Sequence, residues 1–291
     1  MEEKYIVGLG EALWDILPQG KQIGGAPANF AYHVQQFGLP VRVVSAVGHD
    51  ALGREILDIF RTRHIPALVP QLDHPTGTVQ VTLDDHGVPS YQIVPQVAWD
   101  YIPFTPELET LARHTRVVCF GSLAQRHPVS RQTIHRFIDA MPQSDEVLKV
   151  FDINLRQHFY TEEILRTSLL QSNVLKINDE ELHTVSQLFG YIETDAEAQA
   201  RRLLNEYHLQ MVILTCGENG SYVFTPHETL HQETPRVAVV DTVGAGDSFT
   251  AAFVASLLRG KSLAEAHHTA VQVAAYVCTQ PGAMPLLPSS F

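Results

Sequence analysis

Short apolar segments alternate with amphipathic helical patterns along most of this chain, and this alternation constrains its fold most. The apolar segments lack the strict alternation of a half-exposed strand, as expected for strands that helices cover on both faces. A helical pattern over Pro27–Phe37 places Phe30, Val34 and Phe37 on one face and stops at Gly38. The alternation predicts an open parallel sheet with helices on both sides. The candidate strands are Tyr5–Val7, Val41–Val47, Arg116–Phe120, Val147–Phe151, Asn173–Ile177 and Met211–Thr215.

Two segments interrupt this alternation. Residues 11–24 read as extended and loop-rich, and residues 76–101 read as a β-hairpin with a turn rich in Asp and Gly at 84–87. Together the two segments predict a small β-sheet lid on the α/β frame. Because no internal repeat or long linker is present, we expect residues 1–291 to form a single domain.

Charge and composition exclude several classes of protein. The formal charge of −12 disfavours nucleic acid and an anionic membrane as partners, because little basic surface is available to contact phosphates. No stretch approaches the roughly 20 apolar residues that cross a bilayer, and the start lacks the features of a signal peptide. The three cysteines are scattered, which is typical of a reducing compartment. The sequence therefore predicts a cytoplasmic protein.

The segment Asp241–Phe249, which reads Asp-Thr-Val-Gly-Ala-Gly-Asp-Ser-Phe, is the strongest functional signal. It follows a strand-like run, Val237–Val240, and opens an apolar helix. The small residues Gly244, Ala245 and Gly246 let the backbone approach a ligand closely and direct N–H groups toward it. The helix N-terminus adds attraction for an anion, so this turn is suited to phosphate.

Asp247 lies directly beside this predicted anion site. A carboxylate next to a phosphate makes chemical sense when it accepts a proton from a hydroxyl that attacks the phosphate. The structural alternative is a simple helix cap, which is common for Asp after glycines. The full nine-residue segment favours the catalytic interpretation.

Two segments resemble the signatures of the ribokinase-like (pfkB) carbohydrate kinases. Asp241–Phe249 resembles the second signature, and Gly24–Ala31, followed by Gly38, resembles the first. They lie more than 200 residues apart in the order that the family requires, and the resemblance extends over essentially the whole chain. It implies a doubly wound, mostly parallel sheet flanked by helices, with a β-sheet lid. It also implies phosphoryl transfer from ATP, with Mg²⁺, to a primary hydroxyl of a sugar.

The resemblance assigns Asp15, Gly25, Asn29 and Asp247 to the sugar. A carboxylate such as Asp15 accepts hydrogen bonds from two adjacent hydroxyls, although a surface Asp near a turn is the alternative. The chain is most similar to fructokinases in Gly10–Asp15, Gly24–Ala31 and Ala98–Asp100. Trp99 either stacks on the sugar or anchors the lid as a buried aromatic side chain.

The resemblance also assigns residues to the phosphates and the metal. Arg156 would act on the transferred phosphate together with the Gly244–Gly246 turn, and a surface salt bridge is its alternative. Asn178 and Glu181 would hold Mg²⁺ through water, although acidic residues at a helix start are also ordinary caps. Asp241 would belong to a loop that binds a monovalent cation such as K⁺.

The nucleotide would lie against Thr215, Gly217 and Gly220, together with Asn178 and Gly246. Val271 stands where related kinases often carry an asparagine near the adenine, which leaves the nucleotide preference open.

The sequence thus predicts a kinase that converts D-fructose to fructose 6-phosphate, with ribokinase and 2-keto-3-deoxygluconate kinase as alternatives. An acidic substrate needs a basic contact, and Thr76–Tyr101 contains no Lys or Arg, which favours a neutral sugar. An NAD-dependent oxidoreductase is disfavoured because Gly8-Leu9-Gly10 lacks the third glycine. A catalytically silent sugar sensor is the non-enzyme alternative. We also expect two lids to pair, which would make the protein a homodimer.

Overall fold

A nine-stranded sheet forms the centre of the protein, in a computed structural model that describes residues 4–17, 20–83 and 89–291. Its strand order is β15-β14-β13-β12-β11-β10-β1-β4-β6. Only the pairings of β14 with β13 and β15 are antiparallel among these described strands, so the predicted mostly parallel sheet is confirmed. The strands are β1 (Tyr5–Leu9), β4 (Val41–Val44), β6 (Ala67–Leu68), β10 (Thr115–Phe120), β11 (Leu148–Asp152), β12 (Val174–Asn178), β13 (Met211–Thr215), β14 (Ser221–Phe224) and β15 (Thr229–Gln232).

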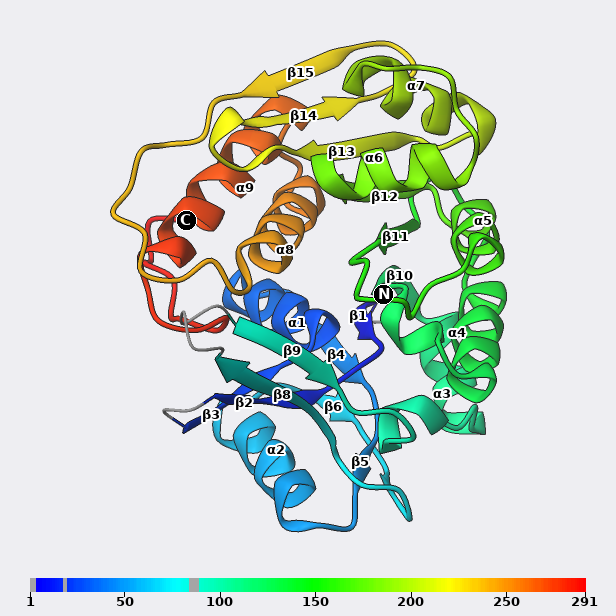
Figure 1. Cartoon of the computed structure of the whole chain (residues 1–291), viewed down its shortest axis with the longest axis vertical. Coiled ribbons are helices and arrows are strands. Elements are labelled where there is room, and N and C mark those ends of the chain that lie inside the picture. The colour runs from blue at the N-terminus through cyan, green and yellow to red at the C-terminus, as the bar shows by residue number, and fades with distance from the viewer. Residues whose placement is uncertain (1–3, 18–19, 84–88) are drawn as a thin grey trace.

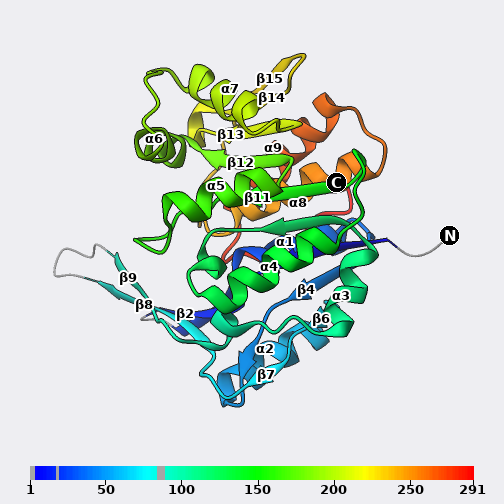
Figure 2. The ribbon, with the colours of Figure 1, turned by 90° about the vertical axis from the view of Figure 1, so that its right-hand side faces the viewer.

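Helices cover both faces of this sheet (Figures 1 and 2). On one face lie α1 (Ala26–Gln36), α2 (Ala51–Thr62), α8 (Ala245–Leu258) and α9 (Leu263–Cys278). On the other face lie α3 (Pro106–Arg113), α4 (Pro128–Ala140), α5 (Glu162–Gln171), α6 (Asp179–Leu188) and α7 (Ala196–Glu206). This doubly wound arrangement is the one expected from the alternation of strands and helices.

Successive residues of the central strands contribute to two separate hydrophobic cores, one on each face of the sheet. Ile6 packs with the α1 and α8 side, whereas Val7 and Leu9 pack with the α3–α7 side. Helix α1 also lies very close to β1, because a Cβ atom at Gly8 would meet the Pro27 carbonyl oxygen at 2.1 Å. Glycine at this position therefore lets the first signature approach the central sheet.

A second, four-stranded sheet stands apart from the first, and we call it the lid sheet. Its order is β3-β2-β8-β9, formed by β2 (Leu13–Leu17), β3 (Gly20–Gly24), β8 (Gly77–Leu83) and β9 (Pro89–Ile93). The two segments predicted to form a small sheet therefore do pair, with β2 parallel to β8. The expected turn at residues 84–87 lies outside the described residues. The remaining short strands, β5 (Val47–Gly48) and β7 (Gln71–Leu72), pair with each other.

Residues 98–101 of the predicted lid segment leave the lid sheet and form a 3₁₀ helix, η1 (Ala98–Tyr101). The side chain of Trp99 is completely buried there. Its indole therefore anchors the lid root, which is the second of the two interpretations drawn from the sequence.

The predicted strand at Val237–Val240 is wrong. This segment is an irregular loop in which Val239 and Val240 are 61% and 64% exposed. The β-branched residues suggested a strand, but the chain here runs past the end of α9, where the Val240 N–H donates to Cys278 O. No helix among the described residues has the length and apolar character needed to cross a membrane.

Candidate active site

Predicted site residues follow the carboxyl ends of several central strands, with Arg156 after β11, Asn178 at the end of β12 and Thr215 at the end of β13. This edge of a parallel sheet is where ligands bind in doubly wound folds. Asn29 of α1 is hydrogen-bonded to Asp247 of α8. The lid sheet lies beside the same edge, next to α1 (Figure 1). The segments carrying the two signatures are therefore neighbours in space, and α1 packs directly on α8.

Asp247 in the first turn of α8 pairs with Asn29 of α1. The Asn29 Nδ2 atom donates to Asp247 Oδ2 at 2.8 Å, across 218 residues of sequence. Burial, reinforced by the negative charge of Asp152, raises the pKa of Asp247 to about 6. A carboxyl with such a pKa is mostly ionised at neutral pH, yet it accepts a proton more readily than a solvated aspartate.

Glu11 and Asp15 bring two more carboxyls to this site. Burial raises the pKa of Glu11 to about 7 and that of Asp15 to about 6. Glu11 Oε1 accepts from the Ala26 N–H at 3.2 Å, whereas Oε2 is buried and has no hydrogen-bond partner in the part of the chain that the structure describes. Gly25 lies against the Glu11 backbone, because a Cβ atom there would meet Glu11 O at 2.3 Å. This end of the candidate site is thus acidic and tightly packed.

Arg156 is the cation that faces these acids. It is exposed in the loop after β11, and its positive charge lowers the pKa values of Glu11, Asp15 and Asp247. Its guanidinium donates to Leu155 O and Asn154 Oδ1 of its own loop. The side chain thus combines proximity to the predicted base with an exposed charge, which suits an anionic ligand.

The sequence interpretation missed a buried ion pair beneath this surface. Lys176 of β12 lies 3.2 Å from Asp152 Oδ1, and Thr250 Oγ1 donates to Asp152 Oδ2 at 3.0 Å. Burial alone would lower the pKa of Lys176, but Asp152, Glu181 and Asp247 outweigh burial and raise it. A lysine inside the otherwise apolar strand Val-Leu-Lys-Ile was the available signal, because an unpaired lysine is rarely buried.

Lys176 also lies close to Gly246. A Cβ atom on Gly246 would lie 2.8 Å from Lys176 Nζ. The ammonium group therefore lies directly under the N-terminal turn of α8, where backbone N–H groups lack partners within the helix. The amide of Ala245, one of the residues in the predicted phosphate turn, donates to Thr242 O at 3.3 Å in this structure. Gly244 begins the turn in the left-handed conformation, with φ of 77°.

Asn178 and Glu181, predicted to hold Mg²⁺, form a capping box at the start of α6. Asn178 Oδ1 accepts from the Glu181 N–H at 2.8 Å, and Glu181 Oε2 accepts from the Asn178 N–H at 3.1 Å. Glu181 Oε1 accepts from the Leu155 N–H at 2.9 Å. The donor set is all oxygen and already hydrogen-bonded, so it fits Mg²⁺ only through water. Within the described part of the chain, no cluster of three or more His, Cys, Asp or Glu is arranged to hold a metal.

The predicted nucleotide loop is a tight turn after β13. Cys216 N donates to Gly220 O at 2.9 Å, and the turn needs left-handed backbone at Gly217 and Gly220, with φ of 54° and 93°. Thr215 ends the strand that leads into it. Val271, in contrast, is buried in the core of the α8–α9 side.

Asp241 joins two turns. Its Oδ1 accepts from the Val243 N–H at 3.0 Å and its Oδ2 from the Gly282 N–H at 3.1 Å. The carboxylate thus links the second signature to the turn after α9, and its assignment to a monovalent cation stays a prediction.

The sequence pattern of the pfkB family carbohydrate kinases matches residues 18–290 of this chain. The chain belongs to the pfkB family of carbohydrate kinases. It is 30% identical to a fructokinase of Escherichia coli, over 87% of this chain and 83% of that protein. It is 29% identical to an ATP-dependent 6-phosphofructokinase of Thermoanaerobacterium thermosaccharolyticum, over 99% of this chain and 92% of that protein.

Solved structures share the fold of this pfkB kinase. The fructokinase of Vibrio cholerae, a double mutant with fructose, ADP and potassium ion bound, gives a TM-score of 0.82 at 23% identity, over 98% of this chain and 95% of that one. The aminoimidazole riboside kinase of Salmonella enterica gives 0.80 at 22% identity, over 98% and 97% of the two chains. The ribokinase-like fold and the carbohydrate kinase family inferred from the two signatures are both confirmed.

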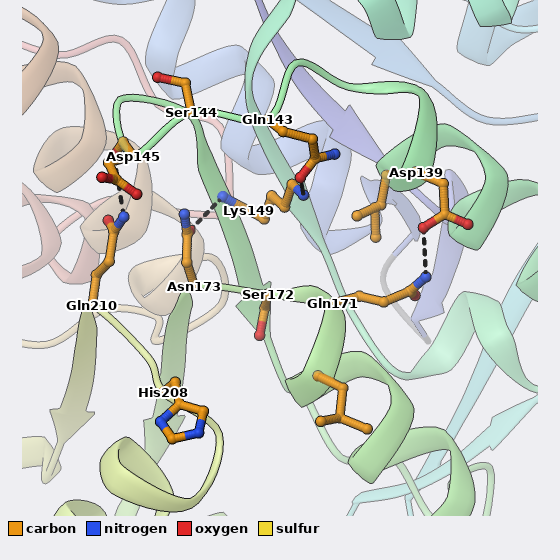
Figure 3. A pocket seen from close by; sticks show the side chains of 12 residues that line it. Asp139, Gln143, Ser144, Asp145, Lys149, Gln171, Ser172, Asn173, His208 and Gln210 are labelled. Atoms are coloured by element: carbon orange, nitrogen blue, oxygen red, sulfur yellow. Dashed lines mark hydrogen bonds between the residues drawn. The ribbon is translucent and has the colours of Figure 1, made fainter.

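A polar hollow of about 890 Å³ lies at the opposite edge of this pfkB kinase, beside the starts of β11, β12 and β13 (Figure 3). The amide of Asn173 lies within it and accepts from the Lys149 N–H at 2.8 Å while donating to Val147 O. This side chain thus satisfies backbone groups at the strand starts. The hollow lies away from the carboxyl edge and contributes nothing to the candidate active site.

Proposed function

We propose that this pfkB kinase transfers the γ-phosphate of ATP to a primary hydroxyl of D-fructose, forming fructose 6-phosphate. The observation that carries the proposal is the Asp247 carboxylate at the N-terminus of α8, which Asn29 orients at 2.8 Å. The similarity to curated fructokinases supports the choice of sugar.

In the proposed reaction, Asp247 takes the proton from the sugar hydroxyl as that oxygen attacks the γ-phosphorus. A new O–P bond forms, the bond between the γ-phosphorus and the bridging oxygen breaks, and ADP leaves with the electron pair. The Gly246 N–H and the Arg156 and Lys176 cations stabilise the charge on the transferred group. Asp15, Gly25 and Asn29 hold the sugar, and Thr215, Gly217 and Gly220 hold the nucleotide. Bound Mg²⁺, held through water by Asn178 and Glu181, would supply further charge neutralisation on the phosphates.

A coupled ADP-release assay tests the sugar assignment. The panel is fructose, ribose, 2-keto-3-deoxygluconate, glucose and fructose 6-phosphate, each with ATP and Mg²⁺. We expect the highest kcat/KM with fructose. A higher value with another sugar would overturn the substrate and keep the mechanism. If none of these sugars is phosphorylated but one of them raises the melting temperature, the silent sugar sensor would be favoured.

The relative named 6-phosphofructokinase makes a phosphorylated sugar the second candidate. The charges of the site disfavour it, because Glu11, Asp15 and Asp247 would repel a second phosphate group. Among the described residues of the lid sheet, Lys21 is the only cation, and it is ion-paired with Glu55. These charges support a neutral sugar.

Three further properties belong to the proposal. Asp241 contributes to a monovalent-cation site, so replacing K⁺ with Na⁺ should lower turnover. Two lid sheets pair to form a homodimer. A monomer in a sedimentation experiment at micromolar concentration would contradict this pairing. The cytoplasmic location stays a prediction, and fractionation of cells checks it.

A further inference from the structure

Arg126 is a buried cation outside the residues assigned to the reaction. It follows a 3₁₀ helix after β10, η2 (Leu123–Gln125), and only 6% of its side chain is exposed. Its Nε and Nη2 atoms donate to the two carboxylate oxygens of Asp100, at 2.7 and 2.8 Å. Nη2 also donates to Val94 O at 2.7 Å. This two-pronged contact fixes the plane of the guanidinium.

The guanidinium holds the root of the lid sheet. Val94 directly follows β9, and the Trp99 ring lies with its centroid 4.0 Å from the guanidinium carbon. The indole of Trp99 fills the space beside Gly77, where a Cβ atom would meet Nε1 at 2.1 Å. Gly77 begins β8, which pairs in parallel with the strand that carries Asp15. Arg126 therefore fixes the start of one lid strand and the end of the other.

The same guanidinium contacts the loop that carries Arg156. The ring centroid of Phe159 lies 4.7 Å from the guanidinium carbon of Arg126. The Phe159 N–H donates to Arg156 O at 3.0 Å, which closes the turn after this arginine. A single side chain thus touches both the lid root and the loop of the predicted phosphate ligand.

The Arg156 loop needs such support. Asn154 and Gln157, on either side of Arg156, have φ values of 43° and 51°, in the left-handed region that L residues rarely adopt. A backbone of this kind persists only when its surroundings over-determine it. The Leu155 N–H is held by Glu181 at 2.9 Å, and the Phe159 contact holds the loop on its other side.

Stability alone is a weak reason for this buried pair. Replacing a buried ion pair with well-packed apolar residues is often neutral or stabilising. In addition, Nη1 of Arg126 is buried without a hydrogen-bond partner among the described residues, which costs free energy. An apolar side chain would avoid both costs, but it would not connect Asp100, Val94 and the Phe159 ring in one fixed plane.

We propose that Arg126 is a positioning residue that couples the root of the lid sheet to the Arg156 loop, so that Asp15 and Arg156 keep their relative placement across the site. The coupling rests on the proposed phosphoryl transfer, in which these two residues act on the sugar and the phosphate. It predicts that a change at Arg126 acts on turnover through Arg156.

A double-mutant cycle tests this dependence. Arg126→Lys keeps the charge but loses the two-pronged contact, and Arg156→Met removes the predicted phosphate cation. We expect Arg126→Lys to lower kcat/KM for the sugar about tenfold in the wild-type background and less than twofold in the Arg156→Met background. Equal losses in the two backgrounds would overturn the proposal. Arg131→Lys is the matched control, because Arg131 donates to Gln125 O and is expected to leave turnover unchanged.

Hydrogen–deuterium exchange of the full chain without substrate gives an independent readout. Arg126→Lys is expected to speed amide exchange in both 94–101 and 155–160, while the β14–β15 hairpin keeps its wild-type rate. Unchanged exchange in either segment would overturn the coupling, even if turnover fell. Faster exchange in both segments, with no sugar turned over, would support the coupling and count against the proposed function alone.

Discussion

At the scale of single residues, the candidate site contains more acidic than basic side chains. Glu11, Asp15 and Asp247 all have raised pKa values, and the exposed Arg156 partly offsets this effect for each of them. Lys176 adds a buried positive charge from below. In the proposed function, such a site favours hydroxyl groups, which donate hydrogen bonds to carboxylates, and phosphate would bind only where the cations and the helix N-terminus lie.

Asp247→Asn should lower kcat by a factor of about 10² to 10⁴, because it removes the base while keeping the shape of the side chain. Sugar affinity, measured by calorimetry, should change by less than about threefold, a range that corresponds to less than 1 kcal/mol. Asp195→Asn is the control, since Asp195 caps the distant helix α7. A kcat within twofold of the wild type would contradict the role of Asp247.

The pH dependence of kcat/KM follows from the same carboxyl. Because the base must be ionised and burial raises the pKa of Asp247 to about 6, kcat/KM should rise with pH up to about 6 and level off above it. Stopped assays between pH 4.5 and 8 measure this limb. An acidic limb centred near pH 4 would show that the base is a solvated carboxyl.

Glu11→Gln should change stability in a pH-dependent way. Burial raises the pKa of Glu11 from 4.5 to about 7, so the folded state favours the protonated form. The stability from this group is present below pH 4.5 and is lost as pH rises through 7. Relative to Glu11→Gln, the wild type should therefore lose on the order of 3 kcal/mol between pH 4.5 and pH 8. Urea unfolding of both proteins measures the difference, and a constant difference would contradict the burial of an ionisable group.

At the scale of elements, the helix N-termini create the site and the turns that precede them set its geometry. Helix α1 begins after Gly25, where a Cβ atom would meet the Glu11 backbone. Helix α8 begins after Gly244, where a Cβ atom would meet Ala283. Both helices have glycine as the N-cap residue, which has no side chain to cap the first turn, although Glu11 accepts a hydrogen bond from the Ala26 N–H of α1. Apart from those of Ala26 and Ala245, which already donate to Glu11 and Thr242, the first-turn N–H groups of these two helices are therefore suited to ligands, whereas helix α6 uses a capping box.

Gly244→Ala should disrupt this geometry, with Gly190→Ala as its control. Both residues have positive φ, 77° and 71°, so both substitutions strain the backbone by about 1 kcal/mol or more. A Cβ atom at Gly190 meets nothing within 4 Å, whereas at Gly244 it meets the Ala283 backbone at 2.7 Å. We expect Gly244→Ala to lose more stability and most of its kcat, as measured by thermal unfolding and the ADP-release assay. Equal effects of both substitutions would show that backbone strain alone matters.

At the scale of the whole molecule, the alternation of strands and helices predicted the doubly wound sheet, and the two signatures contain Gly25, Asn29 and Asp247 of the candidate site. Both are local patterns, because a buried strand and a Gly-rich turn are each visible in the sequence within ten residues. The Lys176–Asp152 pair could not be predicted, because it depends on which strands become neighbours. The predicted strand at Val237–Val240 was wrong for a related reason. Its β-branched residues suit a strand, but no strand among the described residues pairs with it.

Ligand binding should stabilise the whole fold rather than the lid alone. Fructose at about 100 times its Kd should raise the free energy of unfolding by about 2.7 kcal/mol if only the folded protein binds it. Thermal unfolding with increasing fructose measures this, with glucose as the control sugar. A fructose-independent melting temperature would contradict a preformed sugar site.

The hydrogen bonds that link α1 to the end of the chain have a consequence for biosynthesis. Asn29 can form its hydrogen bond only after Asp247, 218 residues later, has been synthesised. His33 likewise needs the Ala283 carbonyl, 250 residues later. At 5–20 residues per second, a ribosome needs roughly 10 to 50 seconds to supply these partners. During that time the apolar side of α1 that α8 later covers stays open to other chains. We therefore expect newly made protein to be most prone to aggregate just before its last two helices emerge, and a prematurely terminated chain carries the first signature without Asp247.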